Sequence, residues 1–380
     1  MIWEGRLRRL AAVATVGALL VVSACGDDDD DGTTSAAAAN GDDASQAQAD
    51  LAGFLDPPGA MPDWPAITAE IPQDVVVYYL ARGNETSAII EDGLESATGL
   101  LGWDLESLTV SDTDPTSFNS TMLSAIQAGA DAIVMTTADS VMFSEALAAA
   151  EDAGIPVVQI GSTEPDAFAG VVDSIAANAD KWGQMMAAAV IADAEAKGDT
   201  AHVGTVTAAQ FAQSDVTLQA FNDHITEYCP DCSTELIDAP VAELFSGQAS
   251  NSVISALQRN PDINYLFFGF GPTSIGVRGA LDSTGFESVR TIGQLPTPTQ
   301  LQEMKDPGGA VGWLVAPNQF DAFASIDVVL RALTGGDPTI HNDETWPAWI
   351  LQEDSDFDAT TLPELPIDYT ETFGALWGVS

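Results

Sequence analysis

The chain has 380 residues, 46% of them hydrophobic, with 11 Lys and Arg against 57 Asp and Glu and a formal net charge of −46. This hydrophobic content excludes a wholly disordered protein, and the length suggests about two globular domains plus tails. Nucleic acid is excluded as a partner, because neutralising phosphates needs clustered basic residues and the lysines (Lys181, Lys197 and Lys305) are far apart.

Residues 1–24 are predicted to be a lipoprotein signal peptide. Arg6, Arg8 and Arg9 precede an apolar run over 10–24, which is shorter than the about 20 residues that a membrane-spanning helix needs. Small residues then precede Cys25, as in the lipobox of bacterial lipoproteins, which this segment resembles and in which the cysteine is lipidated. We expect a lipid anchor on the extracytoplasmic face of the cell membrane, in the periplasm or at the cell surface. The alternative is an ordinary signal peptide with an incidental Cys25.

Residues 25–71 are predicted to be a disordered acidic tether. Its first half has no aromatic and almost no large apolar side chain, so it cannot bury enough surface to offset the entropy of ordering. The acidic run 27–31 resembles the start of a calcium loop, but the position of the loop's bidentate Glu holds Ala38. No metal and no cofactor are expected.

The rest of the chain alternates apolar strand-like runs with helical patterns. Residues such as Ile90, Leu94, Ala97 and Leu101 recur at helical spacing. Strands that are apolar along their whole length, separated by amphipathic helices, predict an α/β fold with parallel sheets covered on both faces. The strand-like runs are 75–80, 108–110, 132–135, 156–160, 203–206, 265–268, 289–292 and 311–315.

A short pattern occurs twice and suggests two similar halves. The sequence Ser-Ala-Ile-Gln at 124–127 returns as Ser-Ala-Leu-Gln at 255–258, each followed by an Asp seven residues after the Ser and then by an apolar strand. Chance similarity between helix ends is the alternative. Two doubly wound lobes would face each other across a cleft at the carboxyl ends of their strands, where ligands bind in such sheets.

The stretches 125–135, 146–158 and 275–285 resemble type I periplasmic solute-binding proteins of ABC transporters, most closely the ribose and galactose class. The resemblance spans about residues 73–352 and implies two doubly wound parallel-sheet lobes joined by a hinge. It also implies a small solute as ligand, a permease and an ATPase as partners, and a monomer. The expected parts are an N-terminal lobe of 72–176 plus 318–345, a C-terminal lobe of 177–317 plus 346–353, and a C-terminal strap of 354–380.

The family's sugar-binding residues are only partly present. Asn84 matches the family's asparagine in the loop after the first strand, but the aromatic pair that stacks on the sugar is replaced by Thr86 and Ser87. The family's polar pair after the strand 156–160 is replaced by Gly161 and Ser162. In the second lobe Asp215 stands about where the family has an Arg, Phe270 where it has an Asn, and Leu295 where it has an Asp. The resemblance therefore implies the fold more firmly than it implies pentose or hexose binding.

The predicted ligand-binding residues follow the strand ends. Arg82 is notable in a chain with few basic residues, because a guanidinium binds carboxylate or phosphate in a bidentate manner, although a surface ion pair is the alternative. Amide side chains suit hydroxyl groups but also cap helices, and aromatic rings either stack on ligands or pack in the core. The predicted set is Arg82, Asn84, Glu85, Gly161, Ser162, Gln210, Phe211, Asp215, Phe270, Gln294 and Asn318.

Cys229 and Cys232 have the spacing of a redox motif, but they do not stand at the start of a helix after a strand. A short structural disulfide is the preferred interpretation, and a metal knuckle would need two further ligands. Phosphate-loop, Gly-x-Ser-x-Gly and helical His motifs are absent, so no enzyme activity is expected. The sequence thus predicts a lipid-anchored substrate-binding protein that captures a sugar or sugar-like solute for an ABC importer. The alternative is an envelope sensor or an enzyme on the same two-lobe fold.

Overall fold

The structure is a computed structural model that describes residues 40–61, 63–111, 114, 116–136, 143–161, 173–175, 178–209, 215–244, 246–305, 308–341 and 347–379. The predicted signal peptide and Cys25 lie outside these residues. The elements are α1 (Asn40–Ala52), β1 (Val76–Arg82), α2 (Glu85–Leu101), β2 (Asp104–Val110), α3 (Ser117–Ala128), β3 (Ala132–Thr136), α4 (Ser144–Ala153), β4 (Val157–Ile160), β5 (Asp173–Ile175), α5 (Ala179–Lys197), β6 (His202–Thr207), α7 (Val216–Tyr228), β7 (Ser233–Asp238), α8 (Val241–Leu244), α9 (Ser250–Arg259), β8 (Tyr265–Phe268), η3 (Gly271–Ser274), α10 (Val277–Thr284), β9 (Arg290–Gln294), α11 (Pro298–Met304), β10 (Ala310–Val315), α12 (Asn318–Thr334), η4 (Pro338–His341), β11 (Trp349–Leu351) and α13 (Tyr369–Trp377).

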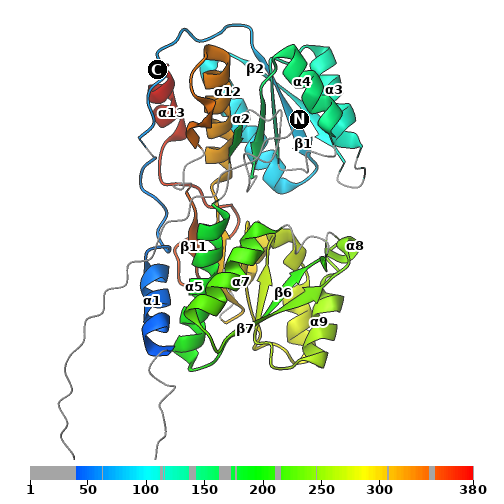
Figure 1. Ribbon diagram of the computed structural model, residues 1–380, viewed down its shortest axis with the longest axis vertical. Coiled ribbons are helices and arrows are strands. Elements are labelled where there is room, and N and C mark those ends of the chain that lie inside the picture. The colour runs from blue at the N-terminus through cyan, green and yellow to red at the C-terminus, as the bar shows by residue number, and fades with distance from the viewer. Residues whose placement is uncertain are drawn as a thin grey trace, which may run out of the picture. The chain divides into compact units, whose positions relative to one another are not determined.

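Two separate sheets organise the described part of the chain (Figure 1). One has the strand order β2-β1-β3-β4-β5, and the other has the order β11-β10-β9-β8-β6-β7. Neighbouring strands pair in parallel except β11, which runs antiparallel to β10. The predicted fold class, α/β with two doubly wound parallel-sheet lobes, is confirmed.

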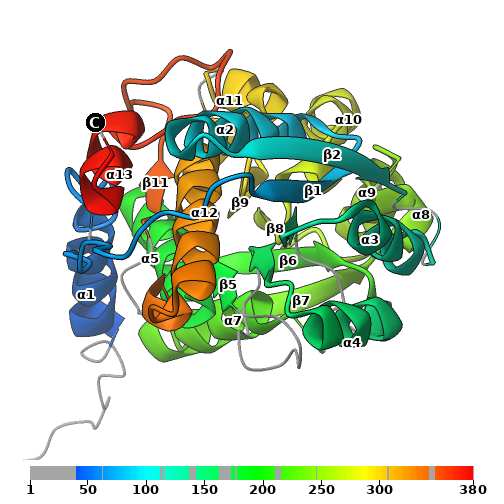
Figure 2. The same cartoon turned by 90° about the horizontal axis from the view of Figure 1, so that it is seen from above.

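We call the first sheet and the helices packed on it the N lobe. The helix α2 packs against both β1 and α12, and its buried stripe is the one predicted from sequence: Ile90, Leu94, Ala97 and Leu101. The helix α12 also contacts β4 and β5, and α13 lies against α12 and α2 (Figure 2). The C-terminal segment, predicted to be a strap, therefore brings its last helix onto the N lobe.

We call the second sheet and its helices the C lobe. Its central helix, α5, is buried from Met185 to Ile191 because it has the strands β9, β10 and β11 on one side and the helices α7 and α1 on the other. The helices α5 and α7 approach so closely that a Cβ on Gly183 would lie 2.5 Å from the backbone nitrogen of Phe221. Beyond β1 the chain passes between the lobes four times, after β5, after β10, after η4 and after β11.

The prediction that all of 25–71 is a disordered tether is wrong for its second half. Residues 40–52 form α1, which packs on α5 and α7 of the C lobe, and Trp64 is buried. The physical reason is that Ala47, Leu51 and Phe54 form a small apolar face that becomes a core only when α5 covers it. Composition alone cannot reveal such a partner.

Candidate functional site

The carboxyl ends of the N-lobe strands place Arg82 beside Thr136. The strands β1 and β3 are parallel neighbours, so their last residues reach the same edge of the sheet. The Arg82 Nε donates to the Thr136 Oγ1 at 2.8 Å, and the guanidinium carbon lies 4.9 Å from the centroid of the Phe118 ring on α3. The half-buried guanidinium is thereby held at the sheet edge where ligands bind in folds of this kind.

The loop after β1 is organised around the buried Ser87. Its Oγ lies 2.7 Å from the Tyr79 hydroxyl and accepts a hydrogen bond from the backbone nitrogen of Arg82 at 2.9 Å. Burial raises the pKa of Tyr79 to about 12, so this phenol stays protonated at neutral pH. Asn84 is the N-cap of α2, with its Oδ1 accepting from the Ser87 nitrogen at 2.9 Å, and Glu85 is the first residue of that helix.

The carboxyl ends of the C-lobe strands carry Asp215 and Gln294. Asp215 is the N-cap of α7, and its Oδ1 accepts from the backbone nitrogen of Leu218 at 2.9 Å. Burial raises the pKa of Asp215, although the backbone N–H groups of Leu218 and Thr217 oppose this effect. The Gln294 Nε2 donates to the carbonyl oxygen of Gly269 at 2.6 Å, while its buried Oε1 has no hydrogen-bond partner among the described residues.

The backbone around Phe270 is tightly constrained. A Cβ on Gly271 would lie 2.4 Å from the Leu295 carbonyl oxygen, so only glycine fits where the loop after β8 passes the loop after β9. Leu295 itself has a φ of 53°, a conformation that costs a non-glycine residue energy and often marks a functional site. The Thr273 Oγ1 donates to the Phe270 carbonyl at 2.6 Å, which holds the backbone at this residue, and the Phe270 side chain is partly exposed.

The first turn of α12 holds Asn318, the last residue of the predicted set. Asn318 is buried, and the carboxylate of Glu364 lies at this turn, its Oε1 accepting from the backbone nitrogen of Gln319 at 3.1 Å. The Tyr369 hydroxyl donates to the Glu364 Oε2 at 2.9 Å and accepts from the backbone nitrogen of Leu365. The C-terminal segment therefore supplies the cap of the helix that begins at a lobe crossing.

The structure thus forms two local groups from the predicted residues. Arg82, Asn84 and Gly161 lie at the carboxyl ends of N-lobe strands, whereas Asp215, Phe270 and Gln294 lie at the carboxyl ends of C-lobe strands or in the loops after them. Sequence reasoning missed Thr136, although Thr136 directly follows the predicted strand 132–135. It also missed Glu364, because Glu364 is far in sequence from the start of α12 and no motif connects the two. The predicted residues Ser162, Gln210 and Phe211, and the side chain of Glu85, lie outside the described part of the chain.

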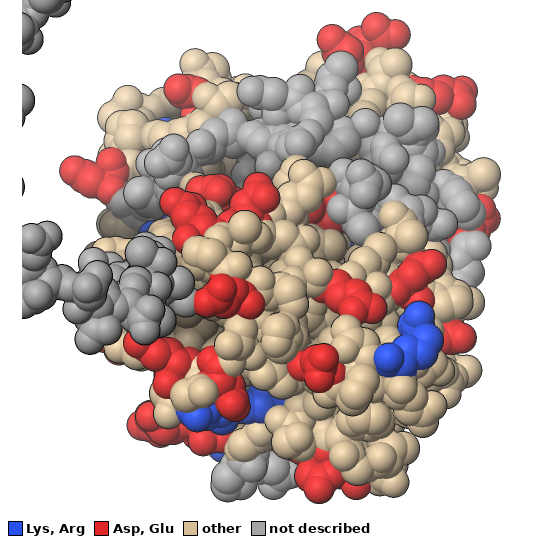
Figure 3. Space-filling view, turned by 60° about the horizontal axis from the view of Figure 1, so that its bottom comes forward, with Lys and Arg blue, Asp and Glu red and all other residues tan. Residues whose placement is uncertain are grey.

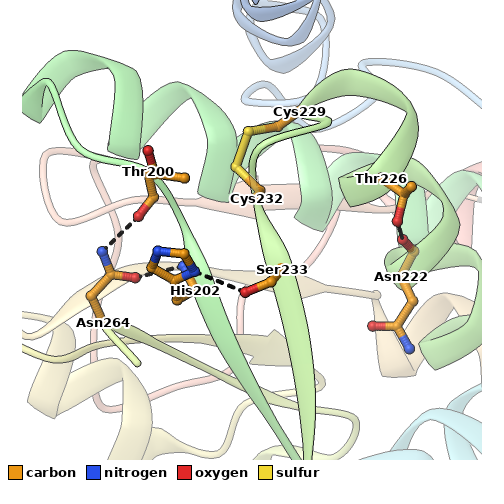
Figure 4. Close-up of a disulfide and its surroundings, with 8 residues drawn as sticks. All are labelled: Thr200, His202, Asn222, Thr226, Cys229, Cys232, Ser233 and Asn264. Carbon is orange, nitrogen blue, oxygen red and sulfur yellow. Dashed lines mark hydrogen bonds between the residues drawn. A yellow bond between two sulfur atoms is a disulfide. The ribbon is translucent and has the colours of Figure 1, made fainter. Parts of the chain in front are cut away.

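Cys229 and Cys232 form a disulfide in the turn between α7 and β7 (Figure 4). Next to it the His202 Nδ1 lies 2.8 Å from the Ser233 Oγ, and the backbone nitrogen of His202 donates to the Asn264 Oδ1. A cavity of about 220 Å³ opens here, at the amino ends of β6, β7 and β8. It lies at the sheet edge away from the candidate ligand residues.

The described residues were also searched for a membrane-spanning helix and for a metal-binding cluster. Among them, no helix is both long and apolar enough to cross a membrane. Nor do the described residues bring together three or more His, Cys, Asp or Glu side chains in an arrangement suited to a metal ion.

Comparison with known proteins assigns the chain to a family. The model of the family described as "Periplasmic binding protein domain" matches residues 75–337, so the chain belongs to this family. No curated protein matches the chain.

Similar solved structures have low sequence identity but the same fold. A glucose-galactose binding protein from Geobacillus stearothermophilus is 17% identical, covering 75% of this chain and 99% of its own, with a TM-score of 0.65. An ABC transporter periplasmic solute binding protein from Actinobacillus succinogenes is 20% identical, covering 74% and 98%, with a TM-score of 0.62. A "putative LacI transcriptional regulator" from Bacteroides fragilis is 15% identical, covering 74% of this chain and 98% of its own, with a TM-score of 0.62.

Proposed function

We propose that the protein is a lipid-anchored, monomeric substrate-binding protein that captures a sugar or sugar-like solute for an ABC importer. Cys25 carries the lipid anchor, so the mature protein is held on the extracytoplasmic face of the membrane. The protein has no catalytic role. The lobes close on the solute by a hinge motion and present it to the permease and its ATPase.

Membership of the periplasmic binding protein family over residues 75–337 is the observation that carries this proposal. Structural neighbours add support from their ligands. The protein from Actinobacillus succinogenes is a complex with D-allose, and a solute binding protein from Agrobacterium vitis is a complex with allitol. Both ligands are neutral polyhydroxyl molecules.

The side chains at the two strand edges favour the same ligand chemistry. The Thr136 hydroxyl, the Gln294 amide and the Arg82 guanidinium offer hydrogen bonds suited to hydroxyl groups. The Asp215 side chain at the C-lobe edge is a carboxyl group, which hydrogen-bonds hydroxyl groups and does not favour an anionic ligand. The partly exposed Phe270 adds an apolar surface for a sugar ring. A neutral solute with several hydroxyl groups therefore fits better than a dianion.

A thermal shift screen tests the proposal. The mature chain is melted in saline buffer with sugars, polyols, nucleosides, amino acids and small carboxylates. A ligand at 100 times its Kd should add about 2.7 kcal/mol, which is a few degrees for a protein of this size. We expect selective hits among sugars or polyols. Hits confined to carboxylates would contradict a sugar or sugar-like ligand. If no compound in the screen raised the melting temperature, a sensor or an enzyme on this fold would be favoured.

Substitution at the sheet edge locates the site. Arg82→Gln should lower the affinity for the hit about tenfold or more, because a charge-assisted hydrogen bond contributes about 1.5–3 kcal/mol. The matched control is Arg278→Gln, since Arg278 on α10 donates to the Asp282 carboxylate and to backbone carbonyls of its own lobe. Equal losses of affinity in the two variants would place the site elsewhere.

A further inference from the structure

The N-terminal arm, which we define as residues 40–67, is bound to the C lobe at its beginning. The buried Ala47 and Leu51 of α1 pack into the apolar cluster around α5, and the Phe54 carbonyl accepts a hydrogen bond from the Ile350 nitrogen of β11 at 2.7 Å. In Figure 1 the blue α1 lies beside α5.

Polar contacts reinforce this first anchor. The Asp50 Oδ2 accepts from the Gln184 Nε2 and from the Tyr228 hydroxyl, each at 3.2 Å. Gln184 also donates to Tyr228 at 2.7 Å, and the Lys181 ammonium lies 4.2 Å from the Phe54 ring centroid. The helix α1 is thus fixed by a buried apolar face and by a closed hydrogen-bond network.

The other end of the arm is bound to the N lobe. The Trp64 and His341 rings pack edge to face, with their centroids 4.1 Å apart. The Pro65 carbonyl accepts a hydrogen bond from the Arg331 Nη2 at 2.9 Å. Arg331 and His341 both donate to the fully buried carboxylate of Asp327 on α12, at 2.6 and 2.8 Å. The second anchor therefore depends on one of the most deeply buried charge clusters in the described residues.

The arm is also joined to the C-terminal helix at this anchor. The Ile67 nitrogen donates to the Leu376 carbonyl at 2.9 Å, and the Trp377 Nε1 donates to the Asp327 Oδ1 at 2.8 Å. The C-terminal helix thus contacts the Asp327 carboxylate directly, whereas the arm contacts Arg331 and His341, which bind that carboxylate. The buried Asp327 pair holds Arg331 and His341 in place, because removal of either partner from such a pair is costly, and these two residues in turn contact the arm.

The segment between the anchors is short, and its middle is exposed. Residues 55–63 connect Phe54 to Trp64, and a fully extended chain of this length spans about 30 Å at most. Gly59 and Ala60 are exposed, and a Cβ on Gly59 would meet no atom within 4 Å. Leu55 is partly buried against the C-lobe cluster and Met61 against the cluster that contains Trp64, so the exposed middle of the segment joins two packed ends. The length of this segment therefore limits how far the two anchor points can separate.

We propose that the N-terminal arm is a strap that joins the two lobes in addition to the four other lobe crossings and restricts their opening. The strap acts on the lobe motion that the proposed function requires, and so rests on that function for its biological meaning. By disfavouring widely open forms, it keeps more of the ligand-free protein in the binding-competent state and raises the apparent affinity for the solute.

The test lengthens the strap without removing either anchor. Twelve Gly and Ser residues are inserted between Gly59 and Ala60 in the full chain carrying Cys25→Ser. Spin labels at Ser124→Cys on α3 and Ser255→Cys on α9, both exposed, report the distance between the lobes. In the absence of ligand, double electron–electron resonance should give a broader distribution shifted to longer distances than in the parent.

The matched control carries the same insertion between Asp199 and Thr200, an exposed loop within the C lobe. It should leave the distance distribution and the melting temperature unchanged. The double variant Gln48→Ala, Asp50→Ala weakens the first anchor by substitution alone, through the contacts of Gln48 with Glu195 and of Asp50 with Gln184. It should broaden the distribution in the same direction, even if the inserted chain folds poorly.

The solute gives a second readout. With the ligand found in the thermal shift screen, the strap insertion should weaken apparent binding by about three- to tenfold, the factor by which the competent population falls. The strap proposal is wrong if both the insertion variant and the Gln48→Ala, Asp50→Ala variant have the same distance distribution as the parent. Because these are measured without ligand, failure to find a solute contradicts the proposed function but leaves this result intact.

Discussion

A single carboxylate closes the first turn of α12. Glu364 lies about fifty residues beyond this turn in sequence, and it accepts hydrogen bonds from the Gln319 backbone nitrogen and the Tyr369 hydroxyl. Burial raises the pKa of Glu364 to about 7, although these hydrogen bonds lower it. The folded protein therefore binds a proton at Glu364 more tightly than the unfolded chain does, for which the ordinary pKa is about 4.5.

This difference predicts the sign of a pH effect. Between about pH 4.5 and 7 the unfolded chain has lost the proton that the folded protein still holds, so Glu364 makes the free energy of unfolding fall as pH rises. Glu364→Gln removes this dependence. The stability of the parent relative to the variant should fall by about 2–3 kcal/mol from pH 5 to pH 8, because one pKa unit corresponds to about 1.4 kcal/mol. Urea unfolding of both proteins across this range measures the difference, and parallel curves would contradict it.

At the residue scale the sequence locates strand ends better than it assigns roles. Asn84 and Asp215 were predicted as ligand-binding residues because they follow strands, and the structure shows each capping a helix. Because the residue after a parallel strand is often also the first residue of a helix, one position can serve both purposes. Glu364 could not be predicted, since nothing local connects it with α12.

The contact between α5 and α7 is decided by glycine at the crossing point. A Cβ on Gly183 would lie 2.5 Å from the Phe221 nitrogen and 2.6 Å from the Ala220 Cβ. Backbone atoms cannot yield as a flexible side chain can, so the two helices would have to separate. This crossing also supports α1, which packs on both helices.

Gly183→Ala should therefore destabilise the protein by about 1–3 kcal/mol, the usual cost of overpacking, despite the better helix propensity of alanine. The control is Gly99→Ala in α2, also inside a helix, where a Cβ would meet nothing within 4 Å. That variant should gain up to about 1 kcal/mol. Denaturant unfolding compares the two, and a stabilising Gly183→Ala would show that the helices are not in close contact.

At the element scale, a helix or strand can be predicted when its own sequence shows a clear hydrophobic pattern, and is missed when its burial depends on a distant segment. The strands predicted from apolar runs are all present. Most of them are buried on both faces and therefore apolar along their whole length, whereas β2 is a mostly exposed edge strand of which the apolar run predicts only the last three residues. The strand β7 was missed since it is an edge strand with mostly exposed residues, and β5 and β11 are only three residues long. The helix α1 was missed because its apolar face is small and needs α5.

The charge of the whole molecule opposes its compact state. The chain has 57 acidic residues against 11 basic ones, and Figure 3 shows acidic side chains scattered over one face with few basic groups between them. Several basic residues are already paired within the fold, as Arg331 is with Asp327 and Arg278 with Asp282. The acidic excess therefore remains largely on the surface, where like charges repel one another through solvent.

Screening by salt should relieve this repulsion. The Debye length falls from about 30 Å at 0.01 M to about 8 Å at 0.15 M ionic strength, so the repulsion between distant carboxylates weakens. We expect the melting temperature to rise by several degrees over this range. Tetramethylammonium chloride is the control, because general screening predicts the same rise as with NaCl, whereas bound sodium ions predict a rise with NaCl alone. A melting temperature independent of salt would mean that the folded surface already separates its charges well enough for repulsion to contribute little.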